Sequence, residues 1–372
     1  MERYPCVYMR GGTSKAIFFH EKDLPAERSR WPEIFLRVMG SPDVKQIDGI
    51  GGATSSTSKI AVISPSSRPD ADIDYNFFQV DILIPNVDNS ANCGNIAAAV
   101  GPYAIDEGLV PAVEPKTVVR IYNTNTGKLI EEHVQVKNGR AVFQGETQIE
   151  GVPGTGAPIE MFFLNPGGSK TGKLFPTGLR KEPLLIPNYD PIEVTIIDCA
   201  NPVVLLRAAD LGLEGTELTE LNDNAKLMEH IEAIRGMAAE KLGFVSDWKT
   251  AKNISTSIPK VSILSSPRSY RNMSGNWTQK EDMDLCVRAV SLGMIHKAIP
   301  LTVATATGAA ACMEGTIISD IVAGTAGKKA IFLGHASGVT AVQVELEGDK
   351  VKKAGIIRTA RRIMDGYIYI NN

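Results

Sequence analysis

Residues 6–24, CVYMRGGTSKAIFFHEKDL, share their order of strand, tight turn and strand with residues 194–211, VTIIDCANPVVLLRAADL. An Asp-Leu pair ends both stretches, Asp23-Leu24 in the first and Asp210-Leu211 in the second. Three further pairs of segments match in the same order: 58–65 with 259–267, 92–100 with 306–313, and 121–127 with 331–338. The four offsets are 187, 201, 214 and 211, which differ only by loop-sized insertions. This ordered set predicts two related domains.

Each half is expected to contain short strands around one helix of small residues. Apolar runs such as KIAVI, FFQVDILI and TVVRIY, bounded by Gly, Pro, Asn and Asp, predict the strands. An Ala-rich helix is expected over 92–108, because small side chains suit an element that a sheet encloses. Amphipathic helices are expected over 27–39, 222–242 and 280–297. The predicted fold class is α+β.

The repeat divides the chain into predicted domains at 1–183 and 184–355, joined by a linker within 178–191. The last strand, within 356–372, is expected to return to the first domain. Two sequence-related halves usually place a ligand site in the cleft between them, so we expect the site there.

Composition excludes several classes of protein. Of the 372 residues, 43% are hydrophobic and 22% charged, as in globular proteins of two domains. The 39 Lys and Arg nearly balance the 42 Asp and Glu, so neither nucleic acid nor a membrane surface is an expected partner. No signal-like apolar run opens the sequence, and the five scattered cysteines form no C-x-x-C pair, which predicts a cytoplasmic protein. A homodimer is an open expectation, because two-fold dimers are the commonest assemblies.

Three segments of the first half carry candidate chemistry. In the Gly-rich turn, backbone N–H groups and hydroxyls of Gly12, Thr13 and Ser14 could hold a carboxylate, or the turn could simply require glycine. Ser58-Lys59 ends a hydroxyl-rich loop directly before a buried strand, where loss of water would favour a neutral amine that can act as a base. Cys93 opens the Ala-rich helix, where free N–H groups favour a thiolate or a substrate carboxylate; a buried apolar thiol is the alternative.

The segment 167–174, GGSKTGKL, resembles a phosphate-binding P-loop but does not fit one. Leu174 replaces the Ser or Thr that magnesium needs, Pro166 precedes the loop, and FPTG follows where a helix should begin. We expect a plain loop or the wall of a carboxylate pocket, with Thr171 as the contributing side chain.

The second half offers further groups for a binding wall. These are His296 and Lys297, late in the predicted helix 280–297, Thr307 and Gly308 in the second Ala-rich segment, and Ser337 and Gly338 after His335. A structural role is the alternative for either histidine. No pair of histidines has the spacing of a metal site, so no metal is expected.

Several motifs in order resemble one family over nearly the whole chain. They are MRGGTSKAIFF, GIGGATSSTSKIAVI, NCGNIAAAVGPYAIDEG, NTNTGK, GSKTGKLFPTG, HASG and RTARRIMDGY. The chain is similar to PrpF-type isomerases, which include methylitaconate, aconitate and 4-oxalomesaconate isomerases or tautomerases. The resemblance implies the diaminopimelate-epimerase-like fold, in which two similar domains each wrap a sheet around a central helix. It also implies a cofactor-independent reaction with Ser14, Lys59 and Cys93 as the catalytic group.

The resemblance and the repeat together suggest a mechanism. Thr307-Gly308 is expected at the position that Cys93-Gly94 occupies in the first half, so the second thiol of a cofactor-free epimerase is absent. Lys59 and Cys93, from one half, would then relocate a proton along an allylic system, with Gly12, Thr13, Ser58, Gly94 and Asn95 binding a small unsaturated polycarboxylate. A keto-enol tautomerase, a true epimerase and a non-catalytic polycarboxylate-binding protein are the alternatives.

Overall fold

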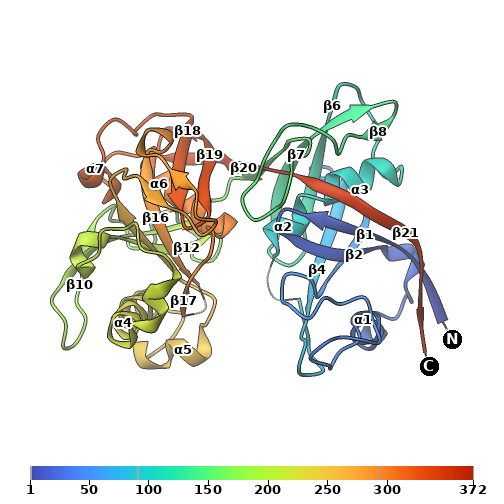
Figure 1. The fold of residues 1–372 in the computed structure, drawn as a ribbon, viewed down its shortest axis with the longest axis horizontal. Helices are drawn as coiled ribbons and strands as arrows, with labels where there is room; N and C mark the ends of the chain where they lie inside the picture. The colour runs from blue at the N-terminus through green and yellow to red at the C-terminus, as the bar shows by residue number, and fades with distance from the viewer. Residues whose placement is uncertain (1, 90–91, 292, 372) are drawn as a thin grey trace. The chain divides into compact units, whose positions relative to one another are not determined.

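The computed structural model describes residues 2–89, 92–291 and 293–371 (Figure 1). The chain forms two compact units. Unit 1 comprises Met1–Phe162 and Ile357–Asn372, and unit 2 comprises Phe163–Ile356. The division at 183 and 184 stays a prediction about the two related halves. No helix in the described part of the chain is both long and apolar enough to cross a membrane.

Unit 1 is built on strands that pair in a fixed order. Strand β21 pairs antiparallel with β1, β1 antiparallel with β2, β2 parallel with β3, β3 antiparallel with β4, β4 parallel with β6, and β6 antiparallel with β7. In Figure 1 the red β21 lies along the blue β1. The strands are β1 (Glu2–Gly11), β2 (Ser14–His20), β3 (Lys59–Pro65), β4 (Ile73–Val80), β5 (Val87–Asp88), β6 (Lys116–Asn123), β7 (Lys128–Lys137), β8 (Arg140–Ala141), β9 (Ile159–Leu164) and β21 (Ala360–Ile370).

Unit 2 repeats this order. Strand β10 pairs antiparallel with β11, β11 antiparallel with β12, β12 parallel with β13, β13 antiparallel with β16, β16 parallel with β18, and β18 antiparallel with β19. The strands are β10 (Glu182–Leu184), β11 (Ile192–Cys199), β12 (Asn201–Arg207), β13 (Lys260–Ser265), β14 (Tyr270–Arg271), β15 (Trp277–Thr278), β16 (Leu285–Ser291), β17 (Met294–Ile295), β18 (Ala330–His335), β19 (Gly338–Glu347) and β20 (Lys350–Arg358).

Strand register supports the duplication read from the sequence. Ile17 lies opposite Ile60 in unit 1, and Val204 lies opposite Val261 in unit 2. These two pairs are separated by the same 187 and 201 positions as the first two sequence matches. The prediction of two similar α+β domains is confirmed.

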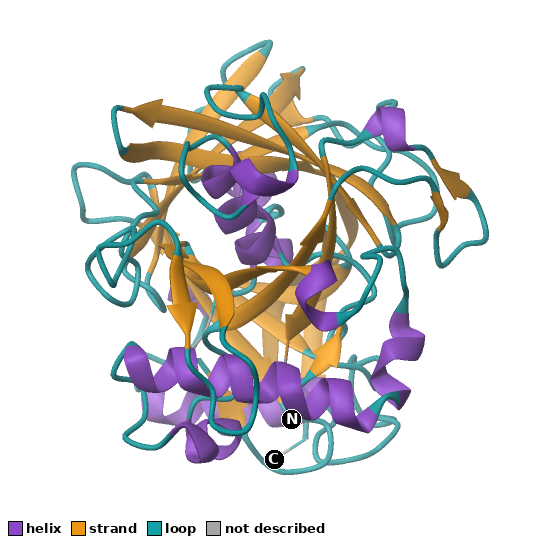
Figure 2. Cartoon of the chain, turned by 90° about the vertical axis from the view of Figure 1, so that its left-hand side faces the viewer, coloured by secondary structure: helices purple, strands orange, loops and turns teal. Residues whose placement is uncertain are grey.

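A helix of small residues lies inside the sheet of each unit. Unit 2 contains α6 (Leu301–Ala311), whose residues are all buried except Thr302, and Figure 2 shows a helix ringed by strands. In unit 1 the predicted helix 92–108 is interrupted and forms α2 (Gly94–Ala97) and α3 (Val100–Asp106). Alanine and glycine make up most of α6, whereas α3 also buries Tyr103 and Ile105. Short residues are needed where a strand crosses a helix closely.

The expected match between Cys93 and Thr307 is wrong. A Cβ atom on Gly101 of α3 would meet Glu132 of β7, and one on Gly308 of α6 would meet Val342 of β19. Ile121 of β6 pairs with Ile130 of β7, and the equivalent Leu333 of β18 pairs with Thr340 of β19. Glu132 and Val342 each lie two residues further along, so they occupy the same register position. Gly101 therefore corresponds to Gly308, and Cys93 corresponds to Pro300. Both Cys93 and Pro300 are N-caps of their helices. Unit 2 still has no thiol at that position.

Two of the three expected amphipathic helices are confirmed. They are α1 (Trp31–Met39), preceded by a 3-10 turn, and α4 (Ala225–Lys241). Helix α1 packs Phe35 against the rings of Phe19 and Phe78. Shorter helices are α5 (Ala251–Ile254), α7 (Ile318–Ile321) and the 3-10 segments Glu21–Asp23, Arg28–Arg30, Ala208–Leu211, Thr219–Asp223, Trp248–Thr250 and Lys280–Asp282.

The helix expected over 280–297 is wrong. Residues Leu285–Ser291 form β16, which carries the run LCVRAVS between β13 and β18, and Met294–Ile295 form β17. Six of the seven β16 residues are buried, on both faces of the strand. A strand buried on both faces lacks the alternation of apolar and polar residues that identifies strands, so its pattern resembles that of a helix.

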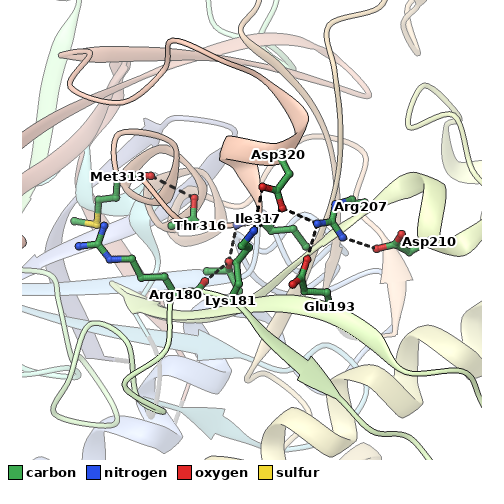
Figure 3. Close-up of polar contacts among 10 residues, drawn as sticks. Arg180, Lys181, Glu193, Arg207, Asp210, Met313, Thr316, Ile317 and Asp320 are labelled. Carbon is green, nitrogen blue, oxygen red and sulfur yellow. Dashed lines mark hydrogen bonds and ion pairs between the residues drawn. The ribbon is translucent and has the colours of Figure 1, made fainter.

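An ion-pair cluster joins distant segments within unit 2 (Figure 3). Arg207 binds Glu193, Asp210 and Asp320, and Lys181 also binds Asp320. Beside this cluster, the Thr195 hydroxyl donates to the Arg180 carbonyl and accepts the Ile317 N–H at 2.9 Å. The ion pairs are partly exposed and contribute little stability each, but together they hold α7 and the segment before β10 against β11 and β12.

The Gly308–Val342 crossing gives a test of the enclosed helix. A Cβ atom on Gly308 would lie 2.6 Å from Cγ1 of Val342. We expect Gly308→Ala to lower the free energy of unfolding by about 1–3 kcal/mol through overpacking. Val342→Ala makes room, so the double variant should lose less than the sum of the two single losses. Urea unfolding of the four proteins measures this, and additive losses would contradict the proposed contact.

Candidate functional site

The Gly-rich turn between β1 and β2 packs against the first residues of α2. A Cβ atom on Gly11 would lie 2.4 Å from the Asn95 carbonyl oxygen, and one on Gly12 would lie 2.2 Å from Asn95 Oδ1. Gly12 also has a positive φ of 49°. Asn95 Nδ2 donates to Thr13 Oγ1 at 3.0 Å. Glycine is thus required for close approach, and three predicted binding residues, Gly12, Thr13 and Asn95, lie together.

The turn is held from its other side by the C-terminal segment. Arg10 Nη1 donates to the carbonyl of Gly12 at 2.9 Å, and to the carbonyl and hydroxyl of Thr359 at 2.9 and 3.0 Å. The Gly12 N–H donates to the Thr359 carbonyl at 3.0 Å. Burial lowers the pKa of Arg10, with a further contribution from Arg361. The sequence analysis assigned no individual role to Arg10 or Thr359, although both lie in motifs that carry the family resemblance.

Lys59 begins β3 and is 7% exposed. Its ammonium donates to Oε1 of Gln79 and lies 5.0 Å from the centre of the Phe77 ring. Gln79 is itself fixed, because its Nε2 donates to the carbonyls of Ser55 at 3.1 Å and Ser58 at 2.9 Å. Within the described residues the amine forms no ion pair with a carboxylate. A desolvated amine held only by a neutral amide and a ring face can exchange a proton or attract an anionic ligand.

The hydroxyl-rich loop before Lys59 lies beside the Gly-rich turn. The Lys15 N–H donates to the Ser56 carbonyl at 2.9 Å, next to the buried Ser14 at the start of β2. Ser58 is fully buried, donates to the Val80 carbonyl at 2.9 Å and accepts from Gln46 Nε2 at 2.7 Å. The structure gives Ser58 a role in holding this loop; its predicted contact with a substrate stays a prediction.

Cys93 is the N-cap of α2. Its carbonyl accepts the Ala97 N–H at 2.9 Å and the Tyr75 hydroxyl at 3.4 Å. Helix α2 has only four residues, so a large helix dipole does not form. Individual N–H groups at the helix start, those of Gly94 and Asn95, are instead the donors available beside the thiol.

Two asparagines that the sequence analysis did not select hold the chain segment directly before Cys93. Asn125 Nδ2 donates to the carbonyls of Asn89 at 2.7 Å and Phe77 at 2.9 Å, and its Oδ1 accepts the Phe77 N–H at 2.8 Å. Asn123 Nδ2 donates to Asn92 Oδ1 at 3.3 Å. The NTNTG motif thus links the segment that carries Cys93 to the strand that carries Phe77. Its repeated amides were the available signal.

In unit 2 the loop containing Thr171 does hold a carboxylate, that of Asp198. Oδ2 of Asp198 accepts the N–H groups of Lys170 and Thr171, both at 2.8 Å, and the Thr171 hydroxyl at 2.9 Å. Ser169 donates to Oδ1 of the same fully buried side chain. The loop donors therefore serve an internal anion, and binding of a substrate by Thr171 stays a prediction.

The other predicted groups of unit 2 fall into two sets. His296 and Lys297 directly follow β17 rather than ending a helix, and the Ser337 hydroxyl donates to the Lys297 carbonyl beside Gly338. Thr307 and Gly308 are buried inside α6, where the Thr307 hydroxyl lies 3.2 Å from that of Ser262. The first set could still face a ligand, whereas the second is packed in the core. Across the described ranges, no three His, Cys, Asp or Glu side chains are grouped to hold a metal ion.

Comparison with known proteins identifies the family. The family model described as "PrpF protein" matches residues 1–371. The chain belongs to the PrpF family. The 3-methylitaconate isomerase of Eubacterium barkeri is 45% identical over 370 residues, covering 99% of this chain and 97% of that protein. The 2-methyl-aconitate isomerase of Shewanella oneidensis is 40% identical over 383 residues, covering 98% and 96%.

A solved structure of the PrpF family agrees with the fold. The crystal structure of a methylitaconate-delta-isomerase matches with a TM-score of 0.92 and 43% identity, covering 99% of this chain and 96% of that chain. The diaminopimelate-epimerase-like fold expected from the sequence is confirmed. The expected enzyme class, isomerase, is confirmed for the family by the names of these relatives.

Thiol burial predicts which cysteine of this PrpF protein reacts. All five cysteines lie in described residues, and among them only Cys93 is not buried. Burial raises the pKa of Cys6 to about 11 and of Cys312 to about 12, and raises those of Cys199 and Cys286. Because the thiolate is the reactive form, we expect iodoacetamide to modify one cysteine per native chain and all five in denaturant. Peptide mass spectrometry locates the label, and Cys93→Ser is the control. Labelling of a buried cysteine at a similar rate would contradict this burial.

Proposed function

We propose that this chain is an isomerase that moves a proton within a small unsaturated di- or tricarboxylate, without a cofactor. The names of its PrpF relatives support the substrate class, since one is a methylitaconate and another a methylaconitate isomerase. The observation that carries the chemistry is the environment of Lys59, a buried amine with a fixed neutral acceptor and no carboxylate partner in the described part of the chain.

The reaction proceeds by allylic proton transfer. A base removes a proton from the carbon next to the C=C bond, and the electron pair delocalises through the double bond into the conjugated carboxylate. An acid then delivers a proton to the far end of the allylic system, so one C–H bond breaks, another forms and the double bond shifts. Lys59 and Cys93 are the proposed acid–base pair. Both lie in unit 1, so the pair comes from one half of the chain.

Donors around the pair stabilise the dienolate. The turn at Gly12–Ser14 and the first N–H groups of α2 are brought together by the Gly12–Asn95 approach. Preorganised N–H and O–H donors aimed at developing negative charge commonly contribute several kcal/mol to catalysis. Ser14, Thr13 and Asn95 are the side chains proposed to hold a substrate carboxylate or the dienolate oxygen.

Isomerisation is favoured over stereoinversion by the difference between the units. Inversion without a cofactor needs an acid and a base on opposite faces of one carbon, supplied in an epimerase by one thiol from each half. Pro300 occupies the helix start in unit 2 that Cys93 occupies in unit 1. A proline has no ionisable group, so the second thiol is missing.

Proton NMR in D2O tests this function. Purified protein is mixed separately with aconitate, 2-methylaconitate, methylitaconate and 4-oxalomesaconate, and the expected result is isomerisation of at least one acid with deuterium at the new allylic carbon. Lys59→Ala and Cys93→Ser should each lower kcat by about 10²-fold or more, the usual contribution of a positioned acid or base. Lys45→Ala, at an exposed lysine, is the matched control and should retain activity.

Each other outcome would assign this protein a different function. Exchange only between keto and enol forms of 4-oxalomesaconate would establish a tautomerase. Tight binding without exchange of any acid would establish a binding protein. Inversion of an amino or hydroxy acid would replace the allylic mechanism with that of an epimerase.

A further inference from the structure

Unit 1 contains a buried acid that the proposed reaction does not use. Glu132, in β7, is fully buried, and its Oε2 accepts the Gly101 N–H at 2.8 Å. Its Oε1 is also buried and has no hydrogen-bond partner among the residues that the structure describes. Burial raises the pKa of Glu132 to about 8, against the opposing effect of the Gly101 N–H. A carboxyl group in an apolar core is costly, so its presence requires a reason.

The duplicated unit shows what this position requires for packing alone. Val342 occupies the equivalent register position in unit 2, where it is fully buried and packs beneath Gly308 as Glu132 packs beneath Gly101. An apolar side chain therefore fills the space under the central helix. The carboxyl group of Glu132 therefore meets a structural requirement that is specific to unit 1.

This requirement arises where the central helix of unit 1 is broken. Helix α6 is continuous over eleven residues, whereas the equivalent segment of unit 1 is split between Ala97 and Val100. Gly101 is thereby the second residue of a new helix, one of the positions whose N–H groups have no helical acceptor. Glu132 supplies that acceptor from a neighbouring strand. A Cβ atom on Gly101 would lie 2.6 Å from Oε2, so it would displace the Glu132 carboxyl group.

The break also sets the place of Cys93. It separates α2, a helix of four residues, which carries Cys93 at its N-cap and Asn95 against the Gly-rich turn. The Tyr75 hydroxyl donates to the Cys93 carbonyl at 3.4 Å. Burial raises the pKa of Tyr75, and both Cys93 and Glu132 act in the same direction.

We propose that Glu132 is a positioning residue, which accepts the Gly101 N–H and so maintains the helix break that presents Cys93. The proposal rests on the proposed function in so far as Cys93 takes part in the reaction. In physical terms, the Glu132 carboxyl group caps the start of α3, the second part of the broken central helix of unit 1. Unit 2 has Val342 at this position, and its central helix is unbroken.

Three variants separate positioning from packing. Glu132→Val installs the residue of unit 2 and removes the acceptor. Glu132→Gln keeps a side-chain oxygen that can accept the Gly101 N–H. Val134→Ala, two residues along the same strand and also fully buried beneath Gly101, removes packing but leaves the hydrogen bond. The readouts are kcat and KM for isomerisation and the rate of Cys93 alkylation by iodoacetamide in the native protein.

We expect Glu132→Val to lower kcat about tenfold or more with little change in KM, because small displacements of a reacting group are costly. Its Cys93 alkylation rate should change at least about threefold, since the thiol's exposure and N–H neighbours depend on the break. Glu132→Gln should restore both values to near those of the unaltered protein, and Val134→Ala should leave both unchanged even where it lowers Tm.

A folded Glu132→Val protein with unaltered kcat and Cys93 alkylation would overturn the proposal and leave Glu132 with a packing role only. If this variant does not fold, Gly101→Ala perturbs the same hydrogen bond from the helix side, and unaltered alkylation there would overturn the proposal equally. Alkylation needs no substrate. Failure of the substrate assignment would therefore remove only the kinetic comparison, and the alkylation result would still decide the role of Glu132.

Discussion

A helix can lie inside a curved sheet only if its side chains are short where the strands pass. This constraint accounts for the alanines of α2, α3 and α6, and for Gly101 and Gly308 at the closest crossings. It also accounts for the Gly-rich turn, whose backbone contacts Asn95 at a distance that excludes a Cβ atom. The candidate site thus depends on the same kind of packing, because Gly11 and Gly12 bring the turn to the first residues of α2 as Gly101 and Gly308 bring strands to the helices.

Two copies of one architecture have diverged at the positions that matter for chemistry. The order and direction of strand pairing are the same in both units, yet unit 1 has Cys93 where unit 2 has Pro300 and Glu132 where unit 2 has Val342. The copy without these groups retains an unbroken, fully packed helix. An ionisable group in an apolar interior reduces stability, so packing alone does not explain the acid at Glu132.

Much of this organisation could be read from the sequence, and the failures have physical causes. Repeated strand and turn patterns predicted the duplication, because apolar alternation and turn residues follow from local backbone geometry. The helix over 280–297 was wrong, since a strand buried on both faces loses its alternation. The pairing of Cys93 with Thr307 was wrong, because alanine-rich segments look alike when shifted by two helical turns. Gln79 and Glu132 could not be found at all, since their roles depend on neighbours distant in the chain, whereas the repeated amides of the NTNTG motif were a signal for Asn125.

The pairing of β21 with β1 has a consequence for synthesis of the protein. All ten residues of β1 have partners in β21, and Thr359 at the start of that segment fixes Arg10 and Gly12. During translation β1 is made before unit 2 and β21 after it, because the residues of unit 2 lie between the two parts of unit 1. Strand β1 therefore stays without this neighbour until the whole of unit 2 has been made. Unit 1, which carries Lys59 and Cys93, is completed after unit 2.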